Sequence, residues 1–249
     1  MSDEAPEADS VAWASRAAAA GARSQARDGH PPWDQGLAAA ADSRSSVPQS
    51  ADRSSLGVLR RLLDGNRRFS TGIETPGRDV AQALRVAELP TPVALVIGCM
   101  DSRVPPEVVF DQSIGDLLVV RTAGHVLDQA ALASVELAIT KIRVPLIVVL
   151  GHEACAAVEY AVDAVHRNAR PDGPLGHLVN QVTPSVPLDN GLSGTQTYRD
   201  AVRGHIAAVV SAVRAVPVVA EAVAATTLVV AGLHYDVGSG QVTLTVEPD

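Results

Sequence analysis

Four short runs of aliphatic residues place the strongest constraint on the fold of this 249-residue chain. Within each run the apolar residues follow one another directly, without the alternating polar residues of a strand that has one face in water. Parallel strands that are covered by helices on both faces have this composition. The runs are VALVIGC (93–99), LLVVRTAG (117–124), PLIVVLGH (145–152) and TTLVVAGLHY (226–235).

The segments between these runs have helical patterns, at 105–113, 128–142 and across much of 153–219. Strands that alternate with helices form right-handed βαβ crossovers in a helix-flanked sheet. The ending, LHYDVGSGQVTLTVEPD (233–249), has a Gly-Ser-Gly turn between two strand-like stretches and predicts a terminal hairpin. We therefore predict an α/β fold with a parallel sheet that is mixed at its edge.

The chain divides by composition into two parts. Residues 1–52 are rich in Ala, Ser, Asp, Arg and Pro and have no apolar period, so they bury too little surface to offset the entropy of ordering. We expect a disordered or loosely ordered extension there, and one folded domain over 53–249.

Two helices are expected at the start of that domain. Ser54 or Ser55 can cap a helix over 56–70. A second helix is predicted at 80–89, before Pro90. The stretch 171–197, heavy in Gly, Pro, Asn and Ser, is expected to be a long loop. The first helix would present one apolar face made by Leu56, Leu59, Leu63 and Phe69.

Charge and composition argue against several partners. The formal charge is −8 and the cationic residues are scattered, while aromatic residues make up only 3%, so neither nucleic acid nor an anionic membrane is an expected partner. The apolar region 207–233 contains Arg214, Pro217 and Glu221, which disfavour a membrane span. Two cysteines are too few for a disulfide framework, and the acidic opening MSDEAPEADS does not resemble an export signal. We expect a cytoplasmic protein.

Three potential metal ligands arrive at one edge of the predicted sheet. Cys99 ends the first run, His152 ends the third, and Cys155 follows where that strand passes into a helix. Ligands bind beyond the carboxyl ends of the strands in such sheets. Two thiolates and one imidazole suit zinc and leave a fourth position open, which is a catalytic pattern.

Other interpretations of these residues stay open on the spacing alone. Cys99 and Cys155 could be small buried hydrophobic residues or, less in keeping with their spacing, a redox pair. His152 could be a hydrogen-bonded structural histidine. Asp101 and Arg103 could form a surface ion pair that contributes at most about 1 kcal/mol.

The two motifs C-x-D-S-R (99–103) and H-x-x-C (152–155) resemble the signatures of the β-class carbonic anhydrases, and the similarity extends over about residues 53–249. The resemblance implies a zinc lyase that interconverts carbon dioxide and bicarbonate through a zinc-bound hydroxide. Its zinc ligands would be Cys99, His152 and Cys155, and Asp101 with Arg103 would form a catalytic dyad. It also implies a homodimer or homotetramer, with an N-terminal helical arm on the partner and the active cleft at the interface.

In the role that the resemblance implies, Asp101 would accept a hydrogen bond from the hydroxide while Arg103 keeps the carboxylate ionised. In some relatives the same aspartate closes the site as a fourth zinc ligand. Two other functions remain as alternatives: a non-catalytic zinc protein of the same fold, and a hydrolase of another small substrate like carbon dioxide. A nucleotide-binding module is disfavoured, because GCMDSR lacks the G-x-G-x-x-G pattern.

The sequence departs from the family pattern at four positions of the site region. Thr122 and His125 stand where RNAGN is common after the second strand, Ala156 stands where Gly is common, and Pro90 replaces a glutamine that donates a hydrogen bond over the substrate. These departures leave the metal ligands in place but bear on the substrate pocket and the turnover rate. His125 could shuttle protons, although a structural role is the favoured interpretation. Val96 replaces a tryptophan typical of members that bicarbonate closes, so no bicarbonate-driven closure is expected.

Overall fold

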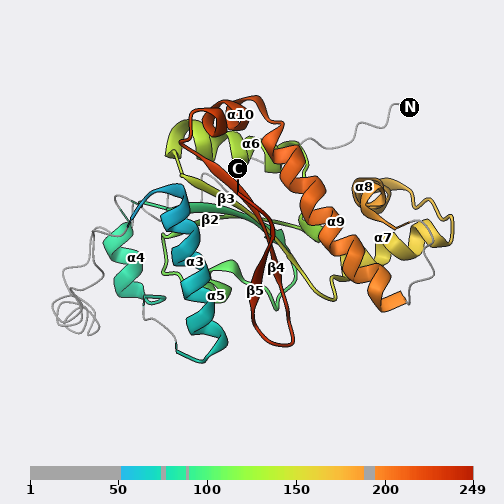
Figure 1. The fold of residues 1–249 in the computed structure, drawn as a ribbon, viewed down its shortest axis with the longest axis horizontal. Helices are drawn as coiled ribbons and strands as arrows, with labels where there is room; N and C mark the ends of the chain where they lie inside the picture. Colours follow the sequence, from blue (N-terminus) through green and yellow to red (C-terminus); the bar gives the residue numbers. More distant parts are fainter. Residues whose placement is uncertain (1–51, 74–76, 88–89, 188–193, 249) are drawn as a thin grey trace, which may run out of the picture. The chain divides into compact units, whose positions relative to one another are not determined.

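The computed structural model describes residues 52–73, 77–87, 90–187 and 194–248. The extension predicted at the start of the chain lies, apart from residue 52, outside these described residues. The described fold is a twisted sheet with helices on both faces (Figure 1).

The sheet has five strands in the order β2-β1-β3-β4-β5. The first four strands pair in parallel and β5 pairs antiparallel with β4, so the predicted α/β fold and the mixed edge are confirmed. The strands are β1 (Ala94–Cys99), β2 (Leu117–Thr122), β3 (Leu146–His152), β4 (Val229–Tyr235) and β5 (Val242–Val246).

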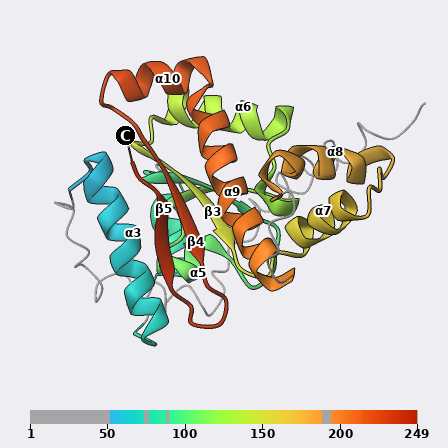
Figure 2. The same cartoon turned by 45° about the vertical axis from the view of Figure 1, so that its right-hand side comes forward.

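Side chains of the central strands alternate between two cores. Leu95 and Ile97 of β1 lie in the core beneath α6 to α10, whereas Val96 lies in the core beneath α3 and α5; Figure 2 shows these helices on opposite sides of the sheet. Because both faces are covered, every residue of β1 and β3 is buried. The helices are α3 (Ser55–Ser70), α4 (Val80–Val86), α5 (Pro106–Val109), α6 (Gln129–Leu137), α7 (Ala156–His166), α8 (Gly173–Val182), α9 (Gly194–Arg214) and α10 (Pro217–Ala224).

The predicted first helix is confirmed as α3, with Ser54 as its cap: the Ser54 side chain accepts a hydrogen bond from the Gly57 amide at 3.1 Å. The predicted apolar face was partly wrong. Leu56 is 56% exposed, and the buried positions are Val58, Leu59, Leu62, Gly65 and Asn66. The helix is turned so that Gly65, which lacks a side chain, faces the neighbouring backbone.

Gly65 and Asn66 tie α3 to the rest of the domain. A Cβ atom on Gly65 would lie 1.8 Å from the Phe110 carbonyl oxygen, so only glycine permits this approach. The buried Asn66 amide group donates to the carbonyl oxygens of Val109 and Gly240, at 3.1 and 2.9 Å. Its oxygen accepts the Val242 amide at 2.8 Å. One side chain thus links α3 to α5 and to the terminal hairpin.

The long loop predicted over 171–197 was wrong in part. Residues Gly173–Val182 form α8 and Thr183–Ser185 form a 3-10 turn, whereas 188–193 lie outside the described residues. Pro174 stands in the first turn of α8, where its missing amide hydrogen costs nothing, and Leu178 and Val182 are buried. Burial of this apolar face outweighs the weak helix propensity of the segment.

The apolar region 207–233 forms the end of α9, then α10 and most of β4. Among the described residues, no single helix is long and apolar enough to cross a membrane. Of the described helices, α9 and α10 taken together are long and apolar enough, but they are bent by 85° at the break between them.

We predict that Asn66→Ala lowers the free energy of unfolding by about 2 kcal/mol or more, because three buried or partly buried backbone groups lose their partner. Urea unfolding followed by circular dichroism measures the effect. Arg67→Ala is the matched control on the same helix, since the Arg67 side chain is 73% exposed, and it should change stability by less than about 1 kcal/mol. Equal effects of the two variants would contradict this role of Asn66.

Candidate metal centre

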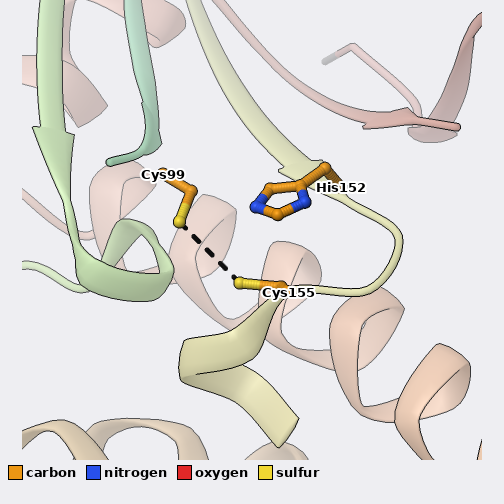
Figure 3. A group of neighbouring side chains, drawn as sticks. All are labelled: Cys99, His152 and Cys155. Atoms are coloured by element: carbon orange, nitrogen blue, oxygen red, sulfur yellow. Dashed lines mark hydrogen bonds between the residues drawn. The ribbon is translucent and has the colours of Figure 1, made fainter. Parts of the chain in front are cut away.

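Three donor side chains meet at the carboxyl edge of the sheet. Cys99 is the last residue of β1, His152 is the last residue of β3, and Cys155 is the residue before α7. Because β1 and β3 are parallel neighbours, their carboxyl ends lie side by side. Figure 3 shows the two sulfur atoms and the imidazole ring turned toward a common centre.

The distances among these donors fit a tetrahedral zinc site. The sulfur atoms of Cys99 and Cys155 lie 3.8 Å apart, close to the separation of about 3.8 Å that two sulfurs have when each lies about 2.3 Å from a tetrahedral zinc. One donor atom from each of the three residues lies within 4.8 Å of the others. All three residues are buried, and neither cysteine is part of a disulfide bond.

The orientation of His152 favours the same ion. Its Nδ1 atom lies 2.9 Å from the Glu153 carbonyl oxygen, and since a carbonyl only accepts, Nδ1 carries the hydrogen. The other ring nitrogen, Nε2, therefore carries the free lone pair. This atom is buried and has no hydrogen-bond partner in the described part of the chain. A backbone carbonyl that fixes the tautomer is the usual arrangement behind a zinc-bound histidine.

The two thiols differ in acidity. The pKa of Cys99 is lowered to about 4, chiefly by its hydrogen bond with Cys155. The same hydrogen bond, together with burial, raises the pKa of Cys155 above its ordinary value. The start of α7 by itself favours a thiolate at Cys155, but the neighbouring Cys99 thiolate outweighs this effect. Without a cation, only one of the two thiols is ionised and the pair carries one negative charge. A divalent metal ion supplies the positive charge that allows the second thiol to ionise as well.

Asp101 and Arg103 lie beside this donor set as an ion pair. The Asp101 Oδ1 atom accepts hydrogen bonds from the amide and Nε of Arg103, at 2.9 and 3.0 Å, and Oδ2 accepts one from Nη2 at 2.6 Å. The Arg103 hydrogen bonds lower the pKa of Asp101 to about 2, so the carboxyl group is ionised at neutral pH. Asp101 Oδ2 also lies 3.9 Å from His152 Nε2.

Arginine side chains join the two motifs, which the spacing alone did not predict. Arg103 Nη2 donates to the Ala154 carbonyl oxygen at 3.0 Å, so it spans from C-x-D-S-R to H-x-x-C. Arg121 Nε donates to the Cys99 carbonyl oxygen at 2.8 Å, and its Nη2 donates to the Asp101 carbonyl oxygen. Both arginine side chains therefore hold the backbone around the donor residues in place. Arg121 carried a signal in the sequence, as a charged residue at the end of an apolar run.

Comparison with known proteins places the chain in a family. The family described as carbonic anhydrase matches residues 94–242. Carbonic anhydrase 2 of Mycobacterium tuberculosis (strain CDC 1551 / Oshkosh) is 39% identical over 193 residues, which cover 76% of this chain and 92% of that protein. A carbonic anhydrase of Mycolicibacterium smegmatis has the same identity and coverage. The chain belongs to the β-class carbonic anhydrase family.

Solved β-class carbonic anhydrases share the fold. The Coccomyxa β-carbonic anhydrase in complex with acetazolamide has a TM-score of 0.60 at 26% identity, over 77% of this chain and 87% of that one. A tetrameric β-carbonic anhydrase of Sordaria macrospora has a TM-score of 0.59 at 23% identity, over 67% and 86% of the two chains. The predicted family and fold are confirmed.

The positions that depart from the family pattern are Thr122, His125, Ala156 and Pro90. Thr122 donates its hydroxyl to the Val126 carbonyl oxygen at 2.8 Å, and His125 is completely buried. Burial lowers the pKa of His125 well below its ordinary value, so the ring is neutral and has no exposed surface from which to pass a proton to water. Ala156 begins α7 and Pro90 is exposed. The structural role of His125 is therefore the interpretation that its position supports.

Two residues near the site were missed in the sequence. The Gly124 amide donates to the Cys99 sulfur at 3.4 Å, and His205 of α9 lies 2.9 Å from the Gly124 carbonyl oxygen through Nε2. The available signal for His205 was its place in the buried stripe of α9 between Ala201 and Val209. A histidine in an apolar stripe needs a partner, but the sequence does not say which.

We predict that Cys99→Ser lowers the zinc content well below one ion per chain, because a serine hydroxyl is a much poorer zinc ligand than a thiolate. Atomic emission of purified, dialysed protein measures the content. Ser102→Ala, an exposed residue of the same loop, is the control and should keep one zinc per chain. Full zinc occupancy in the Cys99 variant would exclude Cys99 as a ligand.

Proposed function

We propose that this chain catalyses the reversible hydration of carbon dioxide to bicarbonate and a proton, at a zinc ion held by Cys99, His152 and Cys155. The observation that carries the proposal is an ionised, arginine-held carboxylate, Asp101, beside a buried set of two thiols and one imidazole. The identity of 39% to a curated carbonic anhydrase supports the same reaction.

When bound, zinc supplies the Lewis acidity that ionises a water molecule near neutral pH and so provides the nucleophile for carbon dioxide. Two thiolates neutralise the formal charge of Zn²⁺, so this donor set makes a weaker Lewis acid than three imidazoles would. The chain's own residues must therefore do more to hold and orient the nucleophile.

Asp101 is suited to that task. Its Oδ2 atom accepts hydrogen bonds from Nη2 of Arg103 at 2.6 Å and, more weakly, from Nε at 3.3 Å, and it lies 3.9 Å from His152 Nε2. A hydrogen bond from the nucleophile to this oxygen would hold the nucleophile in one rotation, with a lone pair toward carbon dioxide. Fixed orientation of this kind lowers the activation free energy without adding any covalent step.

Arg103 keeps Asp101 in this position. It binds the carboxylate through two side-chain nitrogens and its own amide, and it is itself anchored on the Ala154 carbonyl oxygen. An ion pair held at this many points resists rotation of Asp101 onto the metal position. Arg103 thus favours the role of Asp101 as hydrogen-bond acceptor over a role as fourth ligand.

We predict that Asp101→Asn retains zinc but lowers kcat/KM for carbon dioxide hydration by about 100-fold or more, since the amide is neutral and can present a donor where an acceptor is needed. Stopped-flow measurement with a pH indicator gives the rate, and metal analysis gives the zinc content. Asp172→Asn, an exposed carboxylate ahead of α8, is the control and should keep the wild-type rate.

The same measurement separates the alternatives. Wild-type protein with one zinc per chain but no hydration above buffer would favour the non-catalytic zinc protein, or a hydrolase of another small substrate. Hydration in the Asp101 variant at the wild-type rate would refute the role of Asp101 while leaving the reaction itself intact.

We propose further that the chain forms a homodimer or a homotetramer. Strand β2 is at an edge of the described sheet, and its residues Leu117–Val120 are only partly buried. Apolar edge strands of this kind are usually covered. A relative from Sordaria macrospora is described as tetrameric.

Light scattering coupled to size-exclusion chromatography tests the assembly. We expect about two or four times the chain mass of 25.8 kDa. Replacing Val119 by Lys on the edge strand should shift the population toward the monomer, because burying a lysine at an apolar interface is costly. A wild-type monomer at micromolar concentration with full hydration activity would contradict the proposal.

A further inference from the structure

A buried histidine of α9 is connected to the metal centre through one residue of backbone. His205 is 2% exposed, and its Nε2 atom lies 2.9 Å from the Gly124 carbonyl oxygen. The amide of the same Gly124 donates to the Cys99 sulfur at 3.4 Å. A side chain far from the ligands in sequence therefore holds the residue whose amide contacts one of them.

The direction of the first hydrogen bond follows from its acceptor. A carbonyl oxygen only accepts, so His205 Nε2 must carry the hydrogen. Burial lowers the pKa of His205, which leaves the ring neutral with its hydrogen on Nε2. His205 therefore donates a hydrogen bond to the Gly124 carbonyl oxygen and restrains it, while the amide of the same residue faces the Cys99 sulfur.

The loop that carries Gly124 is not held by its own conformational preferences. Gly124 has φ 62° and ψ 25°, and His125 has φ 47°, so two successive residues occupy the left-handed region. For a residue other than glycine this conformation costs on the order of 1 kcal/mol and persists only where surrounding contacts impose it. The hydrogen bond from His205 is one such contact.

His125 provides a second contact by packing. Its ring is fully buried and lies 4.7 Å from the His205 ring, centre to centre, at an interplanar angle of 41°. A Cβ atom on Gly151 would lie 3.3 Å from the His125 Cε1 atom, and 2.5 Å from two side-chain carbons of Ile206 in α9. His125 thus packs against His205 of α9 and lies close to Gly151 near the end of β3.

We propose that His205 is a positioning residue of the metal centre: through Gly124 it fixes the amide that donates to the Cys99 sulfur and so stabilises that thiolate as a zinc ligand. The inference rests on the zinc site proposed above but not on its catalytic activity. Hydrogen bonds to a ligating atom orient it, and loss of such an outer contact typically weakens metal binding by about 10-fold to 100-fold.

Two amide variants of the same chemistry but different length give a sharp test. In His205→Gln the amide nitrogen reaches the place of Nε2 and can still donate to Gly124, whereas in His205→Asn it ends near the place of Nδ1 and cannot. We expect His205→Asn to raise the zinc dissociation constant about 10-fold to 100-fold. His205→Gln should keep it close to the wild-type value, because its amide nitrogen can still donate to the Gly124 carbonyl oxygen. Competition with a chromophoric chelator measures both constants without reference to hydration activity.

Val210→Ala is the control for loss of packing without loss of a hydrogen bond. Val210 is a fully buried residue of the same helix. Truncating this valine should destabilise the fold with no loss of zinc affinity, because Val210 makes no hydrogen bond to Gly124. Equal zinc affinities in the Asn and Gln variants, or a weakening in Val210→Ala as large as in His205→Asn, would overturn the proposal.

A measurement on the wild-type chain keeps the test decisive if the Asn variant fails to fold. In protein loaded with cadmium-113, a hydrogen bond from the Gly124 amide to the Cys99 sulfur transmits scalar coupling from the amide hydrogen to the metal. We expect a correlation between the Gly124 amide and cadmium in the wild type and in His205→Gln. Its absence from wild-type protein with one cadmium per chain would overturn the proposal.

Discussion

The parallel pairing of β1 with β3 is the constraint on which the metal centre depends. These strands are neighbours in the sheet and buried along their whole length, so their carboxyl ends cannot slide relative to each other without exposing apolar side chains. Cys99 and His152 are the last residues of the two strands. Cys155 completes the set because β3 passes into α7 within three residues, which leaves its side chain on the same edge of the sheet.

Burial of this donor set creates a charge problem that the surrounding chain only partly solves. Two thiols and an imidazole lie together with almost no exposure, and a second thiolate is disfavoured beside the first. The nearby cations Arg103 and Arg121 are directed at Asp101 and at backbone carbonyls rather than at the sulfurs. The compensating charge is therefore left to a metal ion, and the arginines fix the loops around it.

The loops around the donors hold backbone conformations that need outside support. Ala154, between His152 and Cys155, has φ 50°, and His125 has φ 47°. In each loop a carbonyl oxygen accepts a hydrogen bond from a residue distant in sequence. Arg103 donates to the Ala154 carbonyl oxygen, and His205 donates to the Gly124 carbonyl oxygen. Strain of this kind is common at functional sites, where surrounding contacts impose the geometry. The two loops beside the metal centre are thus positioned by tertiary contacts.

The sequence by itself determined the layered α/β fold and the terminal hairpin, because buried strands and helix caps are recorded in local patterns, and its two motifs pointed to the donors through their resemblance to a family. It did not determine that α3 buries Gly65 and Asn66 instead of Leu56, or that residues 173–182 form a helix, since both depend on what packs against them. Only the tertiary structure decided that Arg103 reaches Ala154 and that His205 reaches Gly124. The physical reason is that a hydrogen bond between distant segments depends on how helices and loops pack across the sheet, which local residue patterns do not record.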